Sequence, residues 1–328
     1  ECSKKIKISP DETLAIAQSL YEKKLTTYPR TDCRVLSSAI AKVKETNIKG
    51  LKPVEPVTGI IDKILSTGSY KTIEKTRYTD DSKVTDHYAL IPTGKTAEYN
   101  SLSEKEKEVY DLIVRRFLSI FCPPAVYEKV KLTESAGKEK FYATATVLAK
   151  TGYMIVAGIP EQKEDSEAIK SAIEVLTKGS SYPAEYAISY GETKPPKRYT
   201  SGSIVLAMEN AGQLIEDEEL REQIKGTGIG TSATRAETFK KLVANGYIAL
   251  NKKTQVLTPA MYGNMVYEVV EMTMPDLLSP KMTASWEKGL EGIVSGKVTQ
   301  QEYRSKLESY IRKKTADIKE EDKCHEIH

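Results

Sequence analysis

This chain of 328 residues has little net charge, few cysteines and no long apolar run. Its formal net charge is only +3, so any nucleic-acid-binding surface must be local rather than spread over the whole chain. The four cysteines lack the spacing of a zinc site, and we interpret them as reduced thiols. No apolar run reaches membrane-spanning length and no signal peptide is present, which predicts a cytoplasmic protein without a membrane partner.

The remaining composition is that of an ordinary globular protein. Charged residues make up 29% and hydrophobic residues 39% of the chain, and the length allows two or three domains. Because the sequence opens with glutamate rather than methionine, we expect it to be a piece of a longer protein.

The first part of the chain is predicted to be mainly helical. Residues 9–12 (SPDE) have the pattern of a helix start, and the apolar spacing that follows predicts a helix ending near Lys24. Residues 25–28 have strand propensity and lead Tyr28 to the start of a loop. Because glycine and proline recur between residues 46 and 86, we expect that segment to be irregular.

The middle part of the chain has the sequence pattern of strands, and the last part has that of helices. The middle part is expected to be mostly β, with strands at residues 126–132, 141–147, 153–156 and 186–188 and a short helix at 169–176. The last part is expected to be helical, with a cap at Thr231 or Ser232 and a capping box at Thr299 and Glu302. A hairpin pattern over residues 247–258 follows one of its helices, an order that suggests a winged-helix-like element.

One short stretch combines the residue types of a nucleophilic site. Tyr28, Pro29 and Arg30 follow one another, and the proline restricts the backbone of the tyrosine before it. A phenol beside a guanidinium suits attack on a phosphodiester, because the phenol forms the covalent bond while the guanidinium stabilises the developing charge. A free phenol ionises only near pH 10, and the sequence shows no obvious base to assist it. A Tyr-Pro pair in a loop is more often only a turn.

Four stretches in the same order resemble type IA DNA topoisomerases, closest to the topoisomerase III branch. They are LYEKKLTTYPRTD at residues 20–32, HYALIPT at 87–93, KPPKRYT at 194–200 and GIGTSATRAE at 228–237. Two positions depart from the family pattern: Cys33 replaces the usual serine, and Tyr88 stands where this branch often has a second histidine. Together the four matches extend over most of the chain.

The resemblance implies a role for each of six residues. Tyr28 would be the nucleophile that forms a 5′-phosphotyrosine intermediate, and Arg30 would hold the phosphate. His87 would contact a DNA phosphate or aid proton transfer. Three residues at a helix start would bind the backbone of single-stranded DNA, namely Thr231, Thr234 and Arg235. The basic residues of 194–198 would support the strand electrostatically, although such a cluster is more often only a solvated surface.

The implied fold is a multidomain α+β protein that forms part of the type IA toroidal core. A helical gate domain with the tyrosine would cover residues 1–122, a β-rich arch 123–195, and a helical DNA-binding base with the winged-helix-like element 196–328. The family uses Mg²⁺, bound in an N-terminal Toprim domain. No Asp-x-Asp-x-Glu run occurs here, so we expect the Toprim domain to be absent from this chain. A helicase is a further candidate partner on the same basis.

Two other functions remain open at this point. The chain could be a non-catalytic module that binds single-stranded nucleic acid, which would never form a covalent adduct on Tyr28. A tyrosine recombinase lacks support, because its scattered arginine and histidine set before a late tyrosine is not visible and Tyr28 comes early in the chain. On the topoisomerase interpretation, the whole enzyme cuts, passes and reseals DNA without ATP, while this partial core alone is expected to be inactive in relaxation.

Overall fold

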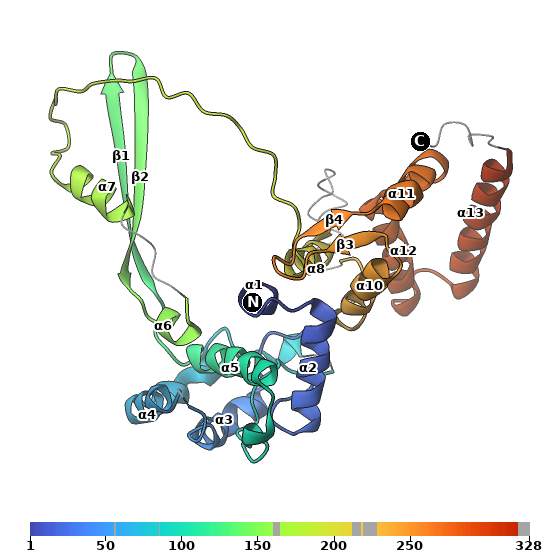
Figure 1. Cartoon of the computed structure of the whole chain (residues 1–328), viewed down its shortest axis with the longest axis horizontal. Coiled ribbons are helices and arrows are strands. Elements are labelled where there is room, and N and C mark those ends of the chain that lie inside the picture. The colour runs from blue at the N-terminus through green and yellow to red at the C-terminus, as the bar shows by residue number, and fades with distance from the viewer. Residues whose placement is uncertain (56, 85, 160–164, 212–217, 219–227, 321–328) are drawn as a thin grey trace. The chain divides into compact units, whose positions relative to one another are not determined.

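A computed structural model describes residues 1–55, 57–84, 86–159, 165–211, 218 and 228–320. It contains helices and two small two-stranded antiparallel sheets, in agreement with the predicted α+β class (Figure 1). Contacts divide the chain into two compact units, Ala17–Pro196 and Glu1–Ile16 with Lys197–His328. In the described part of the chain no helix is both long and apolar enough to span a membrane. Cys324, His325 and His328 lie outside the described residues.

The first part of the Ala17–Pro196 unit is a helical body around an apolar core. Its buried side chains include Leu20, Leu25, Ile48, Leu51 and Ile61. The body's helices are the second half of α2 (Pro10–Glu22), from Ala17 on, together with α3 (Ser38–Gly50), α4 (Thr58–Thr67), η1 (Ser69–Lys75), η2 (Asp81–Lys83), η3 (Tyr99–Ser101) and α5 (Glu104–Ser119). Burial of these large side chains gives the segments between the helices a fixed base.

The expectation that residues 46–86 are irregular is wrong. The structure forms α4 and the 3₁₀ helix η1 within this range. The glycines lie at the helix ends rather than in their middles: Gly50 is the last residue of α3, and Gly68 ends α4 with φ +64°. Ile61 and Ile64 bury one face of α4, so tertiary packing supports a helix that the frequent glycine and proline had obscured.

A long hairpin follows the helical body. Strands β1 (Val126–Ala136) and β2 (Glu139–Lys150) pair antiparallel, and Gly137 turns the chain between them with φ +62°. These strands confirm two of the four predicted in the middle of the chain. Beyond the hairpin lie α6 (Met154–Ala157) and α7 (Asp165–Glu174), and the latter confirms the short helix.

The other two predicted strands are wrong. Residues 154–157 form the single helical turn of α6, whose Met154 and Val156 are buried, and α6 contacts α5. Four apolar residues fit one turn of helix as well as a short strand, so periodicity does not separate the two. Residues 186–188 have no regular structure, and Ile188 is 80% exposed.

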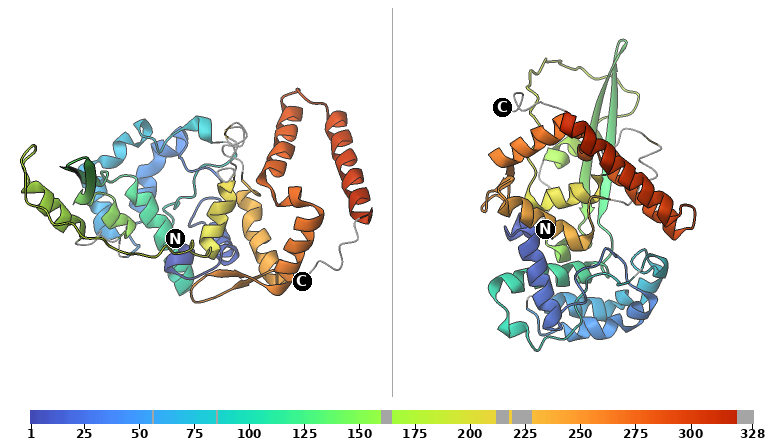
Figure 2. Two further views of the ribbon diagram at one scale, coloured as in Figure 1. Left: turned by 90° about the horizontal axis from the view of Figure 1, so that it is seen from above. Right: turned by 90° about the vertical axis from the view of Figure 1, so that its right-hand side faces the viewer.

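The second unit is mainly helical and contains the predicted hairpin. The strands β3 (Ile248–Leu250) and β4 (Leu257–Pro259) pair antiparallel directly after α10, as predicted from residues 247–258. The capping box of Thr299 and Glu302 is also confirmed. The helices of this unit are α1 (Cys2–Lys5), α8 (Ser201–Glu209), α10 (Ser232–Ala244), α11 (Met261–Thr273), η5 (Pro275–Leu278), α12 (Pro280–Val294) and α13 (Gln300–Glu320), seen from two further directions in Figure 2.

A buried glutamine links three segments of this unit. The amide of Gln255 donates to the carbonyl oxygen of Lys7 at 2.9 Å and accepts from the Ser201 hydroxyl at 2.7 Å. Ser3 and Ser201 are joined by a further hydrogen bond of 3.0 Å between their hydroxyls. This network ties the N-terminal residues to α8 and to the β3–β4 hairpin. Both Lys7 and Gln255 have positive φ, which these contacts help to hold.

A carboxylate network fixes the end of α2 to the start of α5. Glu106 caps α5 together with Ser103, and its carboxylate also accepts from Lys23 Nζ at 2.6 Å and from the Ser19 hydroxyl at 2.7 Å. The Lys23 contact, together with the serine hydrogen bonds, lowers the pKa of Glu106 to about 2. Lys23 lies just before the segment that leads to Tyr28, so this network positions that segment.

Removing this charge should destabilise the protein. We expect Glu106→Gln to lower the free energy of unfolding at pH 7 by on the order of 2–3 kcal/mol, because the folded state holds a carboxylate whose pKa lies well below its unfolded value. The depressed pKa means that the contribution is present above pH 4.5 and declines as the pH falls toward 2. Urea unfolding of both proteins at pH 7 and pH 3 measures the difference.

Glu104→Gln is the matched control. Glu104 is 88% exposed and pairs only with Lys107 at the same helix start, so its loss should change the free energy of unfolding little. Equal effects of the two substitutions, or an effect of Glu106→Gln that does not decline between pH 7 and pH 3, would contradict this account of the network.

Candidate active site

The helix α2 ends in a turn that directs the chain toward Tyr28. Lys24 has left-handed backbone with φ +62°, and its N–H donates to the Tyr21 carbonyl at 2.8 Å. The N–H of buried Leu25 donates to the Leu20 carbonyl at 2.9 Å. This pair of bonds is the Schellman pattern of helix ends. It confirms a helix that ends near Lys24 and fixes the direction in which residues 25–28 leave the helix.

Residues 25–28 then pair with residues 89–93. Thr26 and Pro92 form an antiparallel bridge, flanked by hydrogen bonds of 2.9 Å from Thr27 N to Ile91 O and from Thr93 N to Leu25 O. The Thr27 hydroxyl accepts from Ile91 N at 2.9 Å and donates to Ala89 O at 3.2 Å. These four hydrogen bonds help to hold two of the stretches that carry the family resemblance side by side.

This pairing brings Tyr28 and His87 together. Their ring centroids lie 4.5 Å apart with an interplanar angle of 45°, and Tyr21 meets the Tyr28 ring edge-on at 5.5 Å. The Thr31 hydroxyl donates to the His87 carbonyl at 3.1 Å and accepts from Cys33 N at 3.1 Å. The residue that follows Arg30 therefore anchors the backbone of His87.

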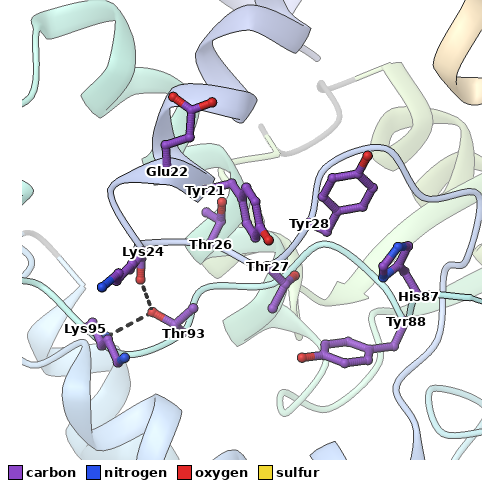
Figure 3. Close-up of a pocket in the computed structure, with 10 residues that line it drawn as sticks. All are labelled: Tyr21, Glu22, Lys24, Thr26, Thr27, Tyr28, His87, Tyr88, Thr93 and Lys95. Carbon is purple, nitrogen blue, oxygen red and sulfur yellow. Dashed lines mark hydrogen bonds between the residues drawn. The ribbon is translucent and has the colours of Figure 1, made fainter.

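The two rings open onto a pocket of about 530 Å³ (Figure 3). Burial raises the pKa of the Tyr88 phenol above its ordinary value. The pocket is lined by Tyr21, Glu22, Lys24, Thr26, Thr27, Tyr28, His87, Tyr88, Thr93 and Lys95. Aromatic rings therefore gather around Tyr28, while two lysines flank Thr93 at the opposite end.

Sequence reasoning did not assign several residues of this pocket. Sequence patterns place Lys24 only at a predicted helix end and Tyr88 only at a departure from the family pattern, and they assign no role to Tyr21 or Lys95. Tyr21 lies in the last turn of α2, within the LYEKKLTTYPRTD stretch, and Lys95 lies two residues after the HYALIPT stretch, so a place in or beside the family-like stretches was the signal available in the sequence.

Arg30 is exposed and is not among the pocket-lining residues. Within the described part of the chain its guanidinium has no hydrogen-bond or ion-pair partner, so its donors are available to a phosphate. The one carboxylate of the pocket, Glu22, accepts a hydrogen bond from Gln18 at 3.0 Å along α2. Of the two rings in contact with Tyr28, the imidazole of His87 is the type of side chain that most often transfers protons in enzymes.

The remaining predicted residues form a separate cluster in the second unit. Thr231 caps α10 and forms a capping box with Thr234, whose hydroxyl accepts from Thr231 N at 2.8 Å. The guanidinium of Arg235 donates to the carbonyl oxygens of Ile229 and Gly230 at 3.1 and 2.9 Å. The cap expected at Thr231 or Ser232 is therefore Thr231, and Arg235 orders the loop before the helix.

The described residues do not provide the magnesium site that the family implies. Over residues 1–320, apart from the segments that the structure leaves undescribed, no group of three or more histidine, cysteine, aspartate or glutamate side chains could hold a metal ion. We therefore assign no metal ligand to this chain and derive no chemical step through a metal.

Comparison with solved structures first establishes the fold class. The chain is similar to the full-length topoisomerase I of Thermotoga maritima, with a TM-score of 0.56 and 24% identity over 97% of this chain and 47% of the other. At that identity the likeness concerns the fold alone. It agrees with an α+β multidomain chain.

Sequence comparison then establishes the family. A model of the DNA topoisomerase family matches residues 1–305, and the chain belongs to this family. It is 34% identical to DNA topoisomerase 3 of Bacillus licheniformis and of Bacillus subtilis strain 168, over 97% of this chain in each case. These relatives confirm the resemblance to the topoisomerase III branch. The chain spans 43% and 44% of their lengths, so it corresponds to less than half of such a protein.

Proposed function

We propose that this chain carries the nucleophile and part of the DNA-binding surface of a type IA DNA topoisomerase, an ATP-independent isomerase. The observation that carries the proposal is the pairing of residues 25–28 with 89–93, which holds the phenol of Tyr28 against His87 at the mouth of a pocket. Both residues come from stretches that resemble the family, although they are 59 positions apart in the sequence.

The proposed reaction is a transesterification at one strand of DNA. The phenolic oxygen of Tyr28 attacks a backbone phosphorus and loses its proton, while the bond from phosphorus to the 3′ oxygen breaks and that oxygen takes up a proton. The products are a 5′-phosphotyrosine and a free 3′-hydroxyl. The reverse reaction reseals the strand after a second strand has passed, and the phosphotyrosine bond conserves the energy, so no ATP is required.

Arg30 and His87 assist this step in two different ways. The guanidinium of Arg30, exposed and unpaired within the described residues, stabilises the charge that develops on the phosphate oxygens. His87, in ring contact with Tyr28, contacts the phosphate or moves the proton. The Thr31 hydroxyl holds the His87 backbone from within the Tyr28 segment.

We also propose the finer division of the chain. Residues 1–122 form the gate domain with the tyrosine, 123–195 a β-rich arch, and 196–328 the helical base. The long β1–β2 hairpin supports the arch, and the order α10, β3, β4 supports a winged-helix-like element. In the base, Thr231, Thr234 and Arg235 contact the backbone of single-stranded DNA at the N-terminus of α10.

A covalent-adduct assay tests the proposed function. The chain is joined in one polypeptide to the segments that the relatives carry outside the matched region, and is mixed with a single-stranded oligonucleotide. We expect denaturant to trap a protein–DNA adduct, and mass spectrometry of its tryptic peptides should place the nucleotide on Tyr28 through a 5′ phosphate. Binding without any adduct would instead identify a non-catalytic module for single-stranded nucleic acid.

The 328 residues alone should bind DNA without relaxing it. Backbone contacts and stacking surfaces give single-strand binding that weakens as salt rises. Religation requires the 3′-hydroxyl to be held in line with the phosphotyrosine, and positioning of this kind depends on parts of the relatives that this chain does not span. We expect no relaxation of supercoiled plasmid by this polypeptide, and magnesium-dependent relaxation by the longer one. Relaxation by the 328 residues, after controls for host enzyme, would contradict this.

A further inference from the structure

The pocket beside Tyr28 has a second end that the proposed chemistry does not use. Thr93 lies there between Lys24 and Lys95, opposite His87 (Figure 3). The Thr93 hydroxyl donates to the Lys24 carbonyl at 2.6 Å and accepts from Lys95 N at 3.2 Å. One hydroxyl therefore fixes the backbones of two lysines that are 71 positions apart in the sequence.

The two ammonium groups have no acidic partner within the described residues. Neither Lys24 nor Lys95 forms a hydrogen bond or ion pair through its side chain there, and both are exposed. By contrast, the neighbouring Lys23 is paired with Glu106 at 2.6 Å. Glu22, the one carboxylate that lines the pocket, is engaged by Gln18. Two unpaired cations at one end of a pocket favour an anion.

The backbone of Lys24 adds a second argument. It occupies a left-handed position at a helix end, where glycine carries no steric penalty and lysine does. Equivalent left-handed positions after α4, α6, α10 and α12 are filled by Gly68, Gly158, Gly246 and Gly296, whereas the one after α1 is filled by Lys7, whose carbonyl oxygen is held by Gln255. A lysine at this helix end therefore has a cost that its cationic side chain, at the pocket, would offset.

We propose that Lys24, Lys95 and the bridging Thr93 form a phosphate subsite for the DNA strand that Tyr28 cleaves. The subsite holds a backbone phosphate next to the scissile one, so that the nucleotide between them lies along the aromatic rings of Tyr21 and Tyr88. This inference rests on the proposed function, and it concerns binding rather than the covalent step.

Salt dependence of single-strand binding tests the subsite. In the 328-residue chain, the double substitution Lys24→Gln with Lys95→Gln should reduce the slope of log affinity against log salt by about 1.4 and the affinity at 0.1 M salt by about 25-fold. The matched control is the double substitution Lys63→Gln with Lys75→Gln, which removes two exposed lysines of the same unit and should leave both quantities unchanged. Fluorescence anisotropy with a labelled oligonucleotide measures them.

Two further measurements distinguish a phosphate held at this subsite from a general loss of positive charge or of stability. Lys24→Gly should keep or raise Tm, because glycine suits the left-handed backbone, and should still lower the slope by about 0.7. Single phosphates of the oligonucleotide are also replaced by neutral methylphosphonates. At one position this replacement should lower the affinity of the unsubstituted chain and leave the affinity of the double lysine variant unchanged.

An unchanged slope and an unchanged methylphosphonate profile in the double lysine variant would overturn the subsite. The proposed function would survive that result, because the adduct on Tyr28 is measured separately. Absence of any single-strand binding by the unsubstituted chain at low salt would overturn the subsite and count against the proposed function as well.

Discussion

Tyr28→Phe should abolish strand cleavage while leaving DNA binding intact. The substitution removes only the phenolic oxygen, which the proposed mechanism uses as the nucleophile, and no other group replaces it. The Tyr28 ring contacts with Tyr21 and His87 do not depend on that oxygen, so the pocket should keep its shape. The longer polypeptide with this substitution should give no covalent adduct after a denaturant quench, whereas its affinity for single strands should stay within about twofold of the unsubstituted protein.

Tyr142→Phe provides the matched control for this prediction. Tyr142 lies on β2 in the same unit and is 74% exposed, outside the residues that line the pocket. Its variant should cleave at the unsubstituted rate. If Tyr28→Phe still leaves protein attached to a 5′ end, the nucleophile is another residue and the assignment of Tyr28 is wrong.

Local features of this fold were predictable because they depend on neighbours in the sequence. The cap at Thr231 and the capping box of Thr299 and Glu302 follow from side chains within a few residues of the backbone groups they satisfy, and the helix end near Lys24 is closed by backbone hydrogen bonds that span at most five residues. The hairpins β1–β2 and β3–β4 likewise have short connections. The α+β class was implied by the family resemblance, and these elements agree with it.

The composition of the pocket was harder to predict from the sequence, because segments far apart in the chain form it. The hydrogen bonds from Thr27 to Ala89 and Ile91 join residues more than 60 positions apart, and nothing local encodes that pairing. Tyr28 and His87 were assigned separately by family resemblance, and their contact was not predicted. The close packing of Gly94 against Asn47, where any side chain on Gly94 would meet the Asn47 backbone at 2.8 Å, holds this segment in place from a third part of the chain.

The wrong secondary-structure predictions also result from contacts between distant parts of the chain. For residues 154–157 and 58–67, local pattern allowed more than one structure, and contacts made elsewhere decided between them. Met154 and Val156 are buried beside α5, and Ile61 and Ile64 bury one face of α4. Tertiary packing therefore overrode weak local preference at both places.

Arg30→Lys should slow cleavage by about 30- to 1,000-fold, which corresponds to about 2–4 kcal/mol of lost charge stabilisation. Lysine keeps the positive charge but replaces a planar fork of donors by a single ammonium group, which cannot bind two phosphate oxygens in the same way. Arg30 is exposed and has no partner among the described residues, so the substitution should leave Tm unchanged. Single-strand affinity should change little, because the number of charges is the same.

Single-turnover cleavage of an oligonucleotide by the longer polypeptide measures this effect. Arg116→Lys is the matched control, since Arg116 is an exposed arginine on α5 in the same unit and lies outside the pocket lining. A slower cleavage rate with unchanged Tm and unchanged binding would mean that Arg30 acts on the developing charge rather than on the fold or on DNA capture. Equal cleavage rates for Arg30→Lys and Arg116→Lys would instead remove Arg30 from the site, and charge stabilisation would then have to come from another cation near the pocket.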